Sequence, residues 1–297
     1  MAAEDYELTG DDVARIAELG GLPVEDEPFS PSDEDEKDAE TWAGDALGPD
    51  AADADGLLKQ MAEAALDPDP DEFSRFMSEN KGTVARAADD PRVPEMVELG
   101  YRFGISRGSV VCMNDLGACY YMGDILEQDY QRARELYQMA ADHGCQQSII
   151  NLGYIFEYGR TGEPDYARAY QCYALAAALE PSWEASYKLG DMYSRGRSVE
   201  RNLSRAHLLW ERSLELAKGI VQIAQPAIRI AQLLVNPDCA KWGIEPDPLR
   251  TLMLFQQAEV GLRVDIANGQ TYYRRRLQQA IDGQRQAREL VEENGLE

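Results

Sequence analysis

Apolar residues recur at helical spacing through most of the chain beyond residue 108, in paired segments joined by short polar turns. Between Leu152 and Ala178, one amphipathic segment ends near Gly159 and a second begins after Asp165. Apolar positions at i, i+3, i+4 and i+7 are typical of a helix with one buried face. The pattern therefore predicts an all-α protein built from helix-turn-helix pairs.

Three stretches of this region repeat one another. The sequence "LGACYYMG" begins at Leu116, "LGYIFEYG" at Leu152 and "LGDMYSRG" at Leu189, at spacings of 36 and 37 residues. At constant offsets, each is followed by a helix-capping residue, an alanine and a large aromatic residue. These are Asp129, Ala133 and Tyr137; Asp165, Ala169 and Tyr173; and Asn202, Ala206 and Trp210. Self-similarity at a fixed period indicates a stacked array of helical pairs.

A glycine recurs inside the first helix of each unit, although it costs about 1 kcal/mol there relative to alanine. We expect tight packing at these positions, with backbones that approach too closely for a side chain: Gly117, Gly153 and Gly190. A second set of glycines is expected to end each first helix in the left-handed conformation: Gly123, Gly159 and Gly196.

The array is predicted to occupy residues 109–269 as about four repeats. The fourth is diverged, although Asp247, Thr251, Phe255 and Ala258 keep the offsets. Residues 81–108 are predicted to form N-terminal capping helices, in which "PEMVELGYRFGISRG" is interpreted as an unpaired second helix. Residues 270–297 are predicted to form a C-terminal capping helix. Atypical end units close the apolar ends of a stacked array.

At these residues the sequence resembles the SEL-one-like repeat family, relatives of the tetratricopeptide repeats. The family pattern is LG-x-x-Y-x-x-G, then an aspartate, then A-x-x-x-W/Y-x-x-A-A. The resemblance is strong over residues 109–218. It implies a right-handed α-solenoid that acts as a scaffold in protein assembly or signalling, without catalysis of its own.

Charge separates the N-terminal part of the chain from the rest. Residues 1–80 carry 25 of the 54 acidic residues and 4 of the 29 basic ones. They are predicted to form an acidic, largely disordered tail with short helical segments, because the stretch from Glu25 to Asp55 has too few aliphatic residues to offset its ordering entropy. We therefore expect the stable unit to begin near residue 80.

Composition also bears on partners and location. A net charge of −25 repels phosphate, so neither nucleic acid nor an anionic membrane surface is an expected partner. No stretch approaches 18 apolar residues, and the five cysteines form no C-x-x-C pair. A cytoplasmic protein is expected.

The sequence offers no constellation for catalysis. The two histidines, His143 and His207, have no Cys or His partner at metal-binding spacing, and no phosphate-binding glycine loop or nucleophile elbow occurs. We therefore predict no enzyme activity, no catalytic residue, no cofactor and no metal site.

A binding surface is predicted on the first helices of the repeats. The positions before the repeat leucine, after the glycine and four residues further on share a face that is expected to be concave. In the second and third units the predicted partner-binding residues are Asn151, Tyr154, Tyr158, Lys188, Asp191 and Arg195. They would bind a protein or peptide segment.

A cluster of arginines raises an alternative. The residues Arg195, Arg197, Arg201 and Arg205 are either ordinary solvated charges or a site for an acidic segment such as the protein's own tail. Two functions stay open: a non-catalytic interaction scaffold or adaptor, and an acidic inhibitor or antitoxin-like protein whose tail masks a cationic surface of its target.

Overall fold

The computed structural model describes residues 6, 8–23 and 54–295 of the chain. These residues contain thirteen α-helices and no strand, which confirms the prediction of an all-α protein. The chain divides into two compact units, residues 1–145 and 146–297, and each is described by itself. The predicted disorder between Glu25 and Asp55 lies almost entirely outside the described residues.

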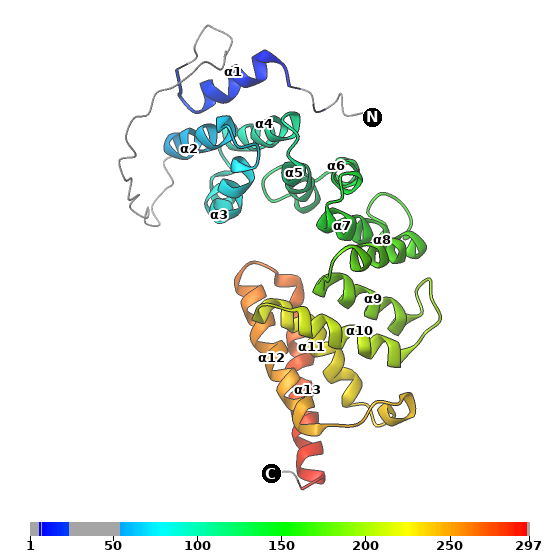
Figure 1. Ribbon diagram of the computed structural model, residues 1–297. Helices are drawn as coiled ribbons and strands as arrows, with labels where there is room; N and C mark the ends of the chain where they lie inside the picture. The colour runs from blue at the N-terminus through cyan, green and yellow to red at the C-terminus, as the bar shows by residue number, and fades with distance from the viewer. Residues whose placement is uncertain (1–5, 7, 24–53, 296–297) are drawn as a thin grey trace, which may run out of the picture. The chain divides into compact units, whose positions relative to one another are not determined.

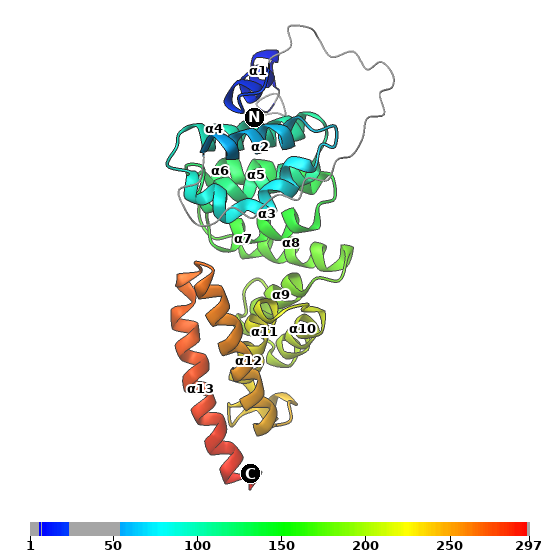
Figure 2. The same ribbon diagram turned by 90° about the vertical axis from the view of Figure 1, so that its left-hand side faces the viewer.

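The described residues of the first unit form six helices (Figures 1 and 2). They are α1 (Gly10–Leu19), α2 (Ala54–Leu66), α3 (Glu72–Ala87), α4 (Arg92–Ser106), α5 (Val110–Met122) and α6 (Tyr130–Asp142). Helix α4 packs against α1, α2, α3 and α5, while α5 and α6 form a helical pair. The sequence "PEMVELGYRFGISRG", which forms most of α4, was interpreted as an unpaired helix. That interpretation is wrong, because α1, α2 and α3 all pack against α4.

Helices α1, α2 and α3 lie wholly or largely within residues 1–80, which the sequence analysis assigned to the tail. Leu58 and Met61 of α2 are fully buried, and the ring of Phe73 in α3 meets Tyr101 of α4 edge-on, with centroids 5.0 Å apart. The structure differs from the expectation because the acidic residues of these helices lie on their outer faces. The net charge of residues 1–80 therefore does not show that one face of each of these helices is buried.

Residues 146–295, the described part of the second unit, form seven α-helices. They are α7 (Gln146–Glu157), α8 (Tyr166–Leu179), α9 (Trp183–Arg195), α10 (Leu203–Leu216), α11 (Ile220–Leu234), α12 (Pro248–Ala267) and α13 (Arg274–Glu293). The pairs are α7 with α8, α9 with α10, and α11 with α12, and the long helices α12 and α13 lie side by side (Figures 1 and 2). A short 3₁₀ turn, η2 (Cys239–Trp242), occupies the inserted stretch between α11 and α12.

The predicted caps are confirmed. The side chains of Asp129, Asp165 and Asn202 accept hydrogen bonds from backbone N–H groups in the first turns of α6, α8 and α10, and Asp247 does the same at α12. Such a cap contributes about 1 kcal/mol by satisfying a donor that the helix leaves open. The glycines that end α5, α7 and α9 have φ values of 71°, 60° and 66°, as expected for left-handed caps.

The recurring glycine lies under an aromatic ring. A Cβ atom at Gly153 would lie 2.4 Å from Cε1 of Tyr173, and one at Gly190 would lie 2.5 Å from the Trp210 ring. In each case the ring belongs to the second helix of the same pair. The expectation of close packing is confirmed, but a ring rather than another backbone fills the space. The missing side chain allows the two helices to close on a fully buried aromatic residue.

The same contact recurs outside the repeats. The ring of Phe73 in α3 lies against Gly100 of α4, and the ring of Phe255 in α12 lies against Gly283 of α13. In the α11–α12 pair, Ala231 stands where the repeats have glycine, and the aromatic residue of that pair packs on the C-terminal helix instead. Phe255 thereby joins α13 to the array.

We expect Gly153→Ala to lower the free energy of unfolding of the second unit by about 1–3 kcal/mol, because the added methyl group overlaps Tyr173. In a Tyr173→Leu background, the same change should be neutral or stabilising by up to about 1 kcal/mol, the helix-propensity difference. Urea unfolding of the four variants measures the coupling. Equal effects of Gly153→Ala in both backgrounds would contradict the ring-on-glycine contact.

Phe73→Ala is expected to cost about 3–5 kcal/mol in the stability of the first unit, since it empties a buried site over Gly100. Chemical denaturation of the full chain followed by circular dichroism tests this. An unchanged transition would show instead that residue 73 lies in the tail, as the sequence analysis expected.

Candidate functional site

The first helices of successive pairs lie next to one another in the second unit, and side chains join α7 to α9 and α9 to α11. Of the predicted binding residues on α7, Asn151 and Tyr154 are half-buried, and Tyr158, which follows the helix end, is 49% exposed. On α9, the Arg195 side chain is 38% exposed. Lys188 and Asp191 are each only 2% exposed. The expectation that these two lie on an open surface is wrong, because α7 and α11 cover them.

Two tyrosines form the exposed end of this face. The rings of Tyr154 and Tyr158 are stacked, with centroids 6.0 Å apart and 13° between their planes. The ammonium group of Lys188 lies 4.5 Å from the Tyr154 centroid and 5.0 Å from that of Tyr158, and its Nζ also donates to the Tyr158 hydroxyl at 3.3 Å. Tyr154 donates to Oε1 of Glu184 at 2.6 Å. The lysine and the carboxylate hold both rings in place.

A buried carboxylate, Glu157, joins α7 to α9. Lys188 Nζ lies 2.5 Å from its Oε2, Arg197 donates to its Oε1 at 2.8 Å, and the Tyr173 hydroxyl donates to Oε2 at 3.0 Å. Its side chain has no exposed surface. Glu157 was not predicted from the sequence, although a single charge in a first helix that is otherwise uncharged was a signal for it.

Asp191 joins α9 to α11 in the same way. Arg229 of α11 binds it through two hydrogen bonds, Nε to Oδ1 at 2.9 Å and Nη2 to Oδ2 at 3.1 Å. The guanidinium group of Arg195 forms an ion pair with the same Oδ2 at 3.0 Å. Arg229 was also not predicted as a site residue. The sequence feature that could have indicated it is a single charged residue inside the apolar helix "IVQIAQPAIRIAQLL".

The charges are kept ionised by one another. Burial alone would raise the pKa of Asp191, but Arg229, Arg195 and Lys188 together hold that pKa below its usual value. Burial would lower the pKa of Lys188, whereas Glu157 outweighs it and raises the pKa. Removing one partner of such a pair costs several kcal/mol, because the other charge is left buried alone.

The cations of this network outnumber its carboxylates. Within the described part of the chain, the acidic partners of its four cations are Glu157 and Asp191, so four positive charges share two negative ones. The cations are Lys188, Arg195, Arg197 and Arg229. We call these six residues the ion network. The ion network therefore carries a net charge of +2. Its most exposed cation is Arg195.

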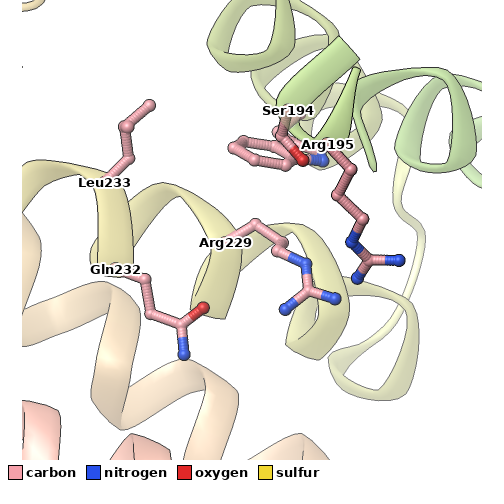
Figure 3. A pocket seen from close by; sticks show the side chains of 6 residues that line it. Ser194, Arg195, Arg229, Gln232 and Leu233 are labelled. Atoms are coloured by element: carbon pink, nitrogen blue, oxygen red, sulfur yellow. The ribbon is translucent and has the colours of Figure 1, made fainter. Parts of the chain in front are cut away.

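A pocket of about 220 Å³ opens beside the ion network. It is lined by residues of α9, α10 and α11, namely Ser194, Arg195, Trp210, Arg229, Gln232 and Leu233. Figure 3 shows the guanidinium groups of Arg195 and Arg229 extending from two helices toward the same side of this pocket.

The arginine cluster proposed from the sequence does not form one open patch. Arg195 and Arg197 contact Glu157, Arg201 donates to the carbonyl oxygen of Ser194, and Arg205 lies over the ring of Tyr193. Contact of this cluster with the acidic tail stays a hypothesis, because the stretch of the tail from residue 24 to residue 53 lies outside the described residues.

The helical pairs coincide with a known repeat. Residues 110–145, 146–180 and 183–217 match the Sel1 repeat, and these are the pairs α5–α6, α7–α8 and α9–α10. These three stretches of the chain are therefore similar to Sel1 repeats. The α11–α12 pair lies outside the matched residues, so the ion network joins the second and third Sel1 repeats to a further pair of helices.

Three solved structures are similar to the chain, each at 20% sequence identity. A Sel1 repeat protein from Oxalobacter formigenes has a TM-score of 0.49, with 74% of this chain and 94% of that one covered. A protective antigen of uropathogenic Escherichia coli strains that displays an SLR fold has 0.47, with 74% and 48% covered. An immunity protein from Pseudomonas aeruginosa has 0.33, with 65% and 82% covered. No curated protein matches the chain.

Over residues 6, 8–23 and 54–295, no helix is both long and apolar enough to cross a membrane. In the same residues, no three or more His, Cys, Asp or Glu side chains are grouped as a metal site would need.

The lowered pKa of Asp191 predicts a dependence of stability on pH. A group whose folded pKa is depressed stabilises the protein above its unfolded pKa, about 3.9, and this contribution is lost as the pH falls through the folded pKa. The difference in unfolding free energy between wild type and Asp191→Asn should therefore be constant above about pH 5 and shrink below pH 4. Urea titrations from pH 7 to about pH 3 measure it. A difference that does not shrink would show that Arg229 and Arg195 do not lower the pKa of Asp191.

Proposed function

We propose that this chain is a non-catalytic scaffold or adaptor whose Sel1 repeats form a right-handed α-solenoid and bind a protein or peptide segment on the face formed by α7, α9 and α11. In solenoids of helical pairs, the first helices line the concave side. The observation that carries the proposal is the stacked pair Tyr154 and Tyr158, held by Lys188 at the open end of this face. A non-catalytic role is supported by the match of three helical pairs to the Sel1 repeat.

The tyrosine pair suits a protein partner for a physical reason. A tyrosine offers a large contact area and loses little conformational entropy when its ring is already fixed. Tyr158 is half exposed, yet it is held by the ring of Tyr154 and the ammonium group of Lys188. A partner side chain that packs on Tyr158 would therefore meet an ordered surface.

The predicted binding residues divide into two roles. Asn151, Tyr154, Tyr158 and Arg195 have exposed atoms that a partner can contact. Lys188 and Asp191 are buried and position the exposed residues, because they fix Tyr158 and Arg195 respectively. The inhibitor alternative depends on the acidic tail, and nothing in the described residues favours it over the scaffold.

We expect Tyr158→Ala to weaken partner binding by at least tenfold, as for an aromatic residue at the centre of an interface. The matched control is Tyr272→Ala, which removes a tyrosine that is 68% exposed elsewhere in the same unit. Peptides selected from a displayed random library on the full-length protein serve as the probe, with affinities measured by isothermal titration calorimetry.

Equal losses for the two variants, or no loss for Tyr158→Ala in a protein that stays folded by circular dichroism, would remove this face as the binding site. Failure of the library to yield any peptide that binds the folded protein would count against the proposed function itself.

A further inference from the structure

The pocket beside the ion network has the composition of an anion site. Two guanidinium groups from different helices, Arg195 of α9 and Arg229 of α11, reach the same side of it (Figure 3). The Ser194 hydroxyl and the Gln232 amide add neutral hydrogen-bonding groups, while Trp210 and Leu233 supply apolar wall. A polar end and an apolar wall together suit a short side chain that carries a charge at its tip.

The two arginines of the pocket have one nearby carboxylate in common, Asp191, which cannot neutralise both of them. Arg195 and Arg229 share one oxygen, Oδ2 of Asp191, at 3.0 and 3.1 Å. The other acidic contact of Arg195 is Glu157 at 3.9 Å, and that carboxylate already serves Lys188 and Arg197. Arg195 is also the most exposed cation of the network. A guanidinium group has five N–H donors, so Arg195 keeps donors that can face an incoming anion.

A carboxylate fits this arrangement better than a phosphate. Planar guanidinium groups bind carboxylates and phosphates alike through two parallel hydrogen bonds, so the choice between them depends on the rest of the pocket. The fixed negative charge of Asp191 lies about 3 Å behind both arginines and repels a doubly charged group more strongly than a singly charged one. The apolar wall of Trp210 and Leu233 can contact the methylene groups of a glutamate, which a phosphate lacks.

We propose that this pocket binds the carboxylate of an acidic side chain, glutamate or aspartate, in the partner segment that packs on Tyr158. The proposal rests on the proposed function and adds the chemical class of the partner. Tyr158 and the pocket are linked through Lys188, Glu157 and Arg195, so one segment crossing from α7 to α11 would place an apolar residue on the tyrosine and an acidic residue in the pocket.

The experiment uses the same displayed library and the full-length chain. Peptides selected on the wild type should share an acidic position. For one synthetic peptide with an amidated C-terminus, Arg195→Gln should weaken binding about tenfold to a hundredfold, the range for a charge-assisted hydrogen bond. The control Arg205→Gln removes an arginine of the same cluster that does not line the pocket, and it should change the affinity by less than about twofold.

A double-mutant cycle separates direct contact from a structural effect. Replacing the acidic peptide residue by its amide should cause the same loss on the wild type and no further loss on Arg195→Gln. If the peptide change and Arg195→Gln weaken binding independently, so that their free-energy losses add, the proposal is overturned. Selected peptides without a shared acidic position, or binding that needs a free peptide C-terminus, would also overturn it while leaving the proposed function intact.

A small probe tests the pocket without any peptide. N-acetylglutamate amide should shift the side-chain Nε–Hε NMR signals of Arg195 and Arg229 and leave that of Arg205 unmoved. In Arg195→Gln, the probe should no longer shift the Arg229 signal. If the shifts occur and no peptide is selected, the pocket binds a carboxylate as proposed, but the proposed function is wrong. Absence of the shifts, or inorganic phosphate displacing the probe at lower concentration, would overturn the carboxylate assignment.

Discussion

The helical pairs of this chain depend on one contact, an aromatic ring of one helix lying on a glycine of its neighbour. Tyr137 on Gly117, Tyr173 on Gly153 and Trp210 on Gly190 repeat it through the three Sel1 repeats. A buried aromatic residue contributes a large apolar area, and the missing side chain of glycine is what allows the second helix to approach closely enough to bury it. The loss of about 1 kcal/mol in helix propensity is small beside that gain.

The same constraint explains how the units end. Phe73 lies on Gly100 and Phe255 lies on Gly283, so helices outside the repeats attach through the contact that the repeats use inside each pair. In the α11–α12 pair, alanine replaces the glycine at position 231, and the aromatic residue packs instead on α13. The diverged pair is thus the place where an internal contact becomes an attachment for the C-terminal helix.

Local signals were enough to predict much of the fold. The helical pairs, the caps at Asp129, Asp165, Asn202 and Asp247, and the left-handed glycines all depend on residues a few positions apart. Helix α2 was predicted only as a short helical segment of the tail, and α3 was not predicted. Their burial was missed because their acidic outer faces dominate the charge of residues 1–80, while their apolar faces pack on α4 far along the chain.

The candidate site was predictable only in part, and the reason is geometric. Helical periodicity assigns Lys188 and Asp191 to the face away from the partner helix α10, and that assignment alone predicts exposure. Burial comes from the neighbouring pairs: Glu157 of α7 covers the lysine, and Arg229 of α11 covers the aspartate. Residues in contact across pairs are separated by 31 and 38 positions, and no pattern inside one repeat shows which charge will meet which.

These buried charges do something that apolar residues in the same places could not. Apolar residues of similar volume would often give equal or greater stability, so stability alone does not account for the ion network. Ion pairs have directions and lengths, and the contacts of Glu157 and Asp191 fix α9 against both α7 and α11 in one register. They also leave the network with more cations than carboxylates, and the surplus lies at Arg195, where the face opens to solvent. The contacts that align the first helices therefore also set the charge that a partner meets, so the packing of the array and the chemistry of its surface are determined by the same side chains.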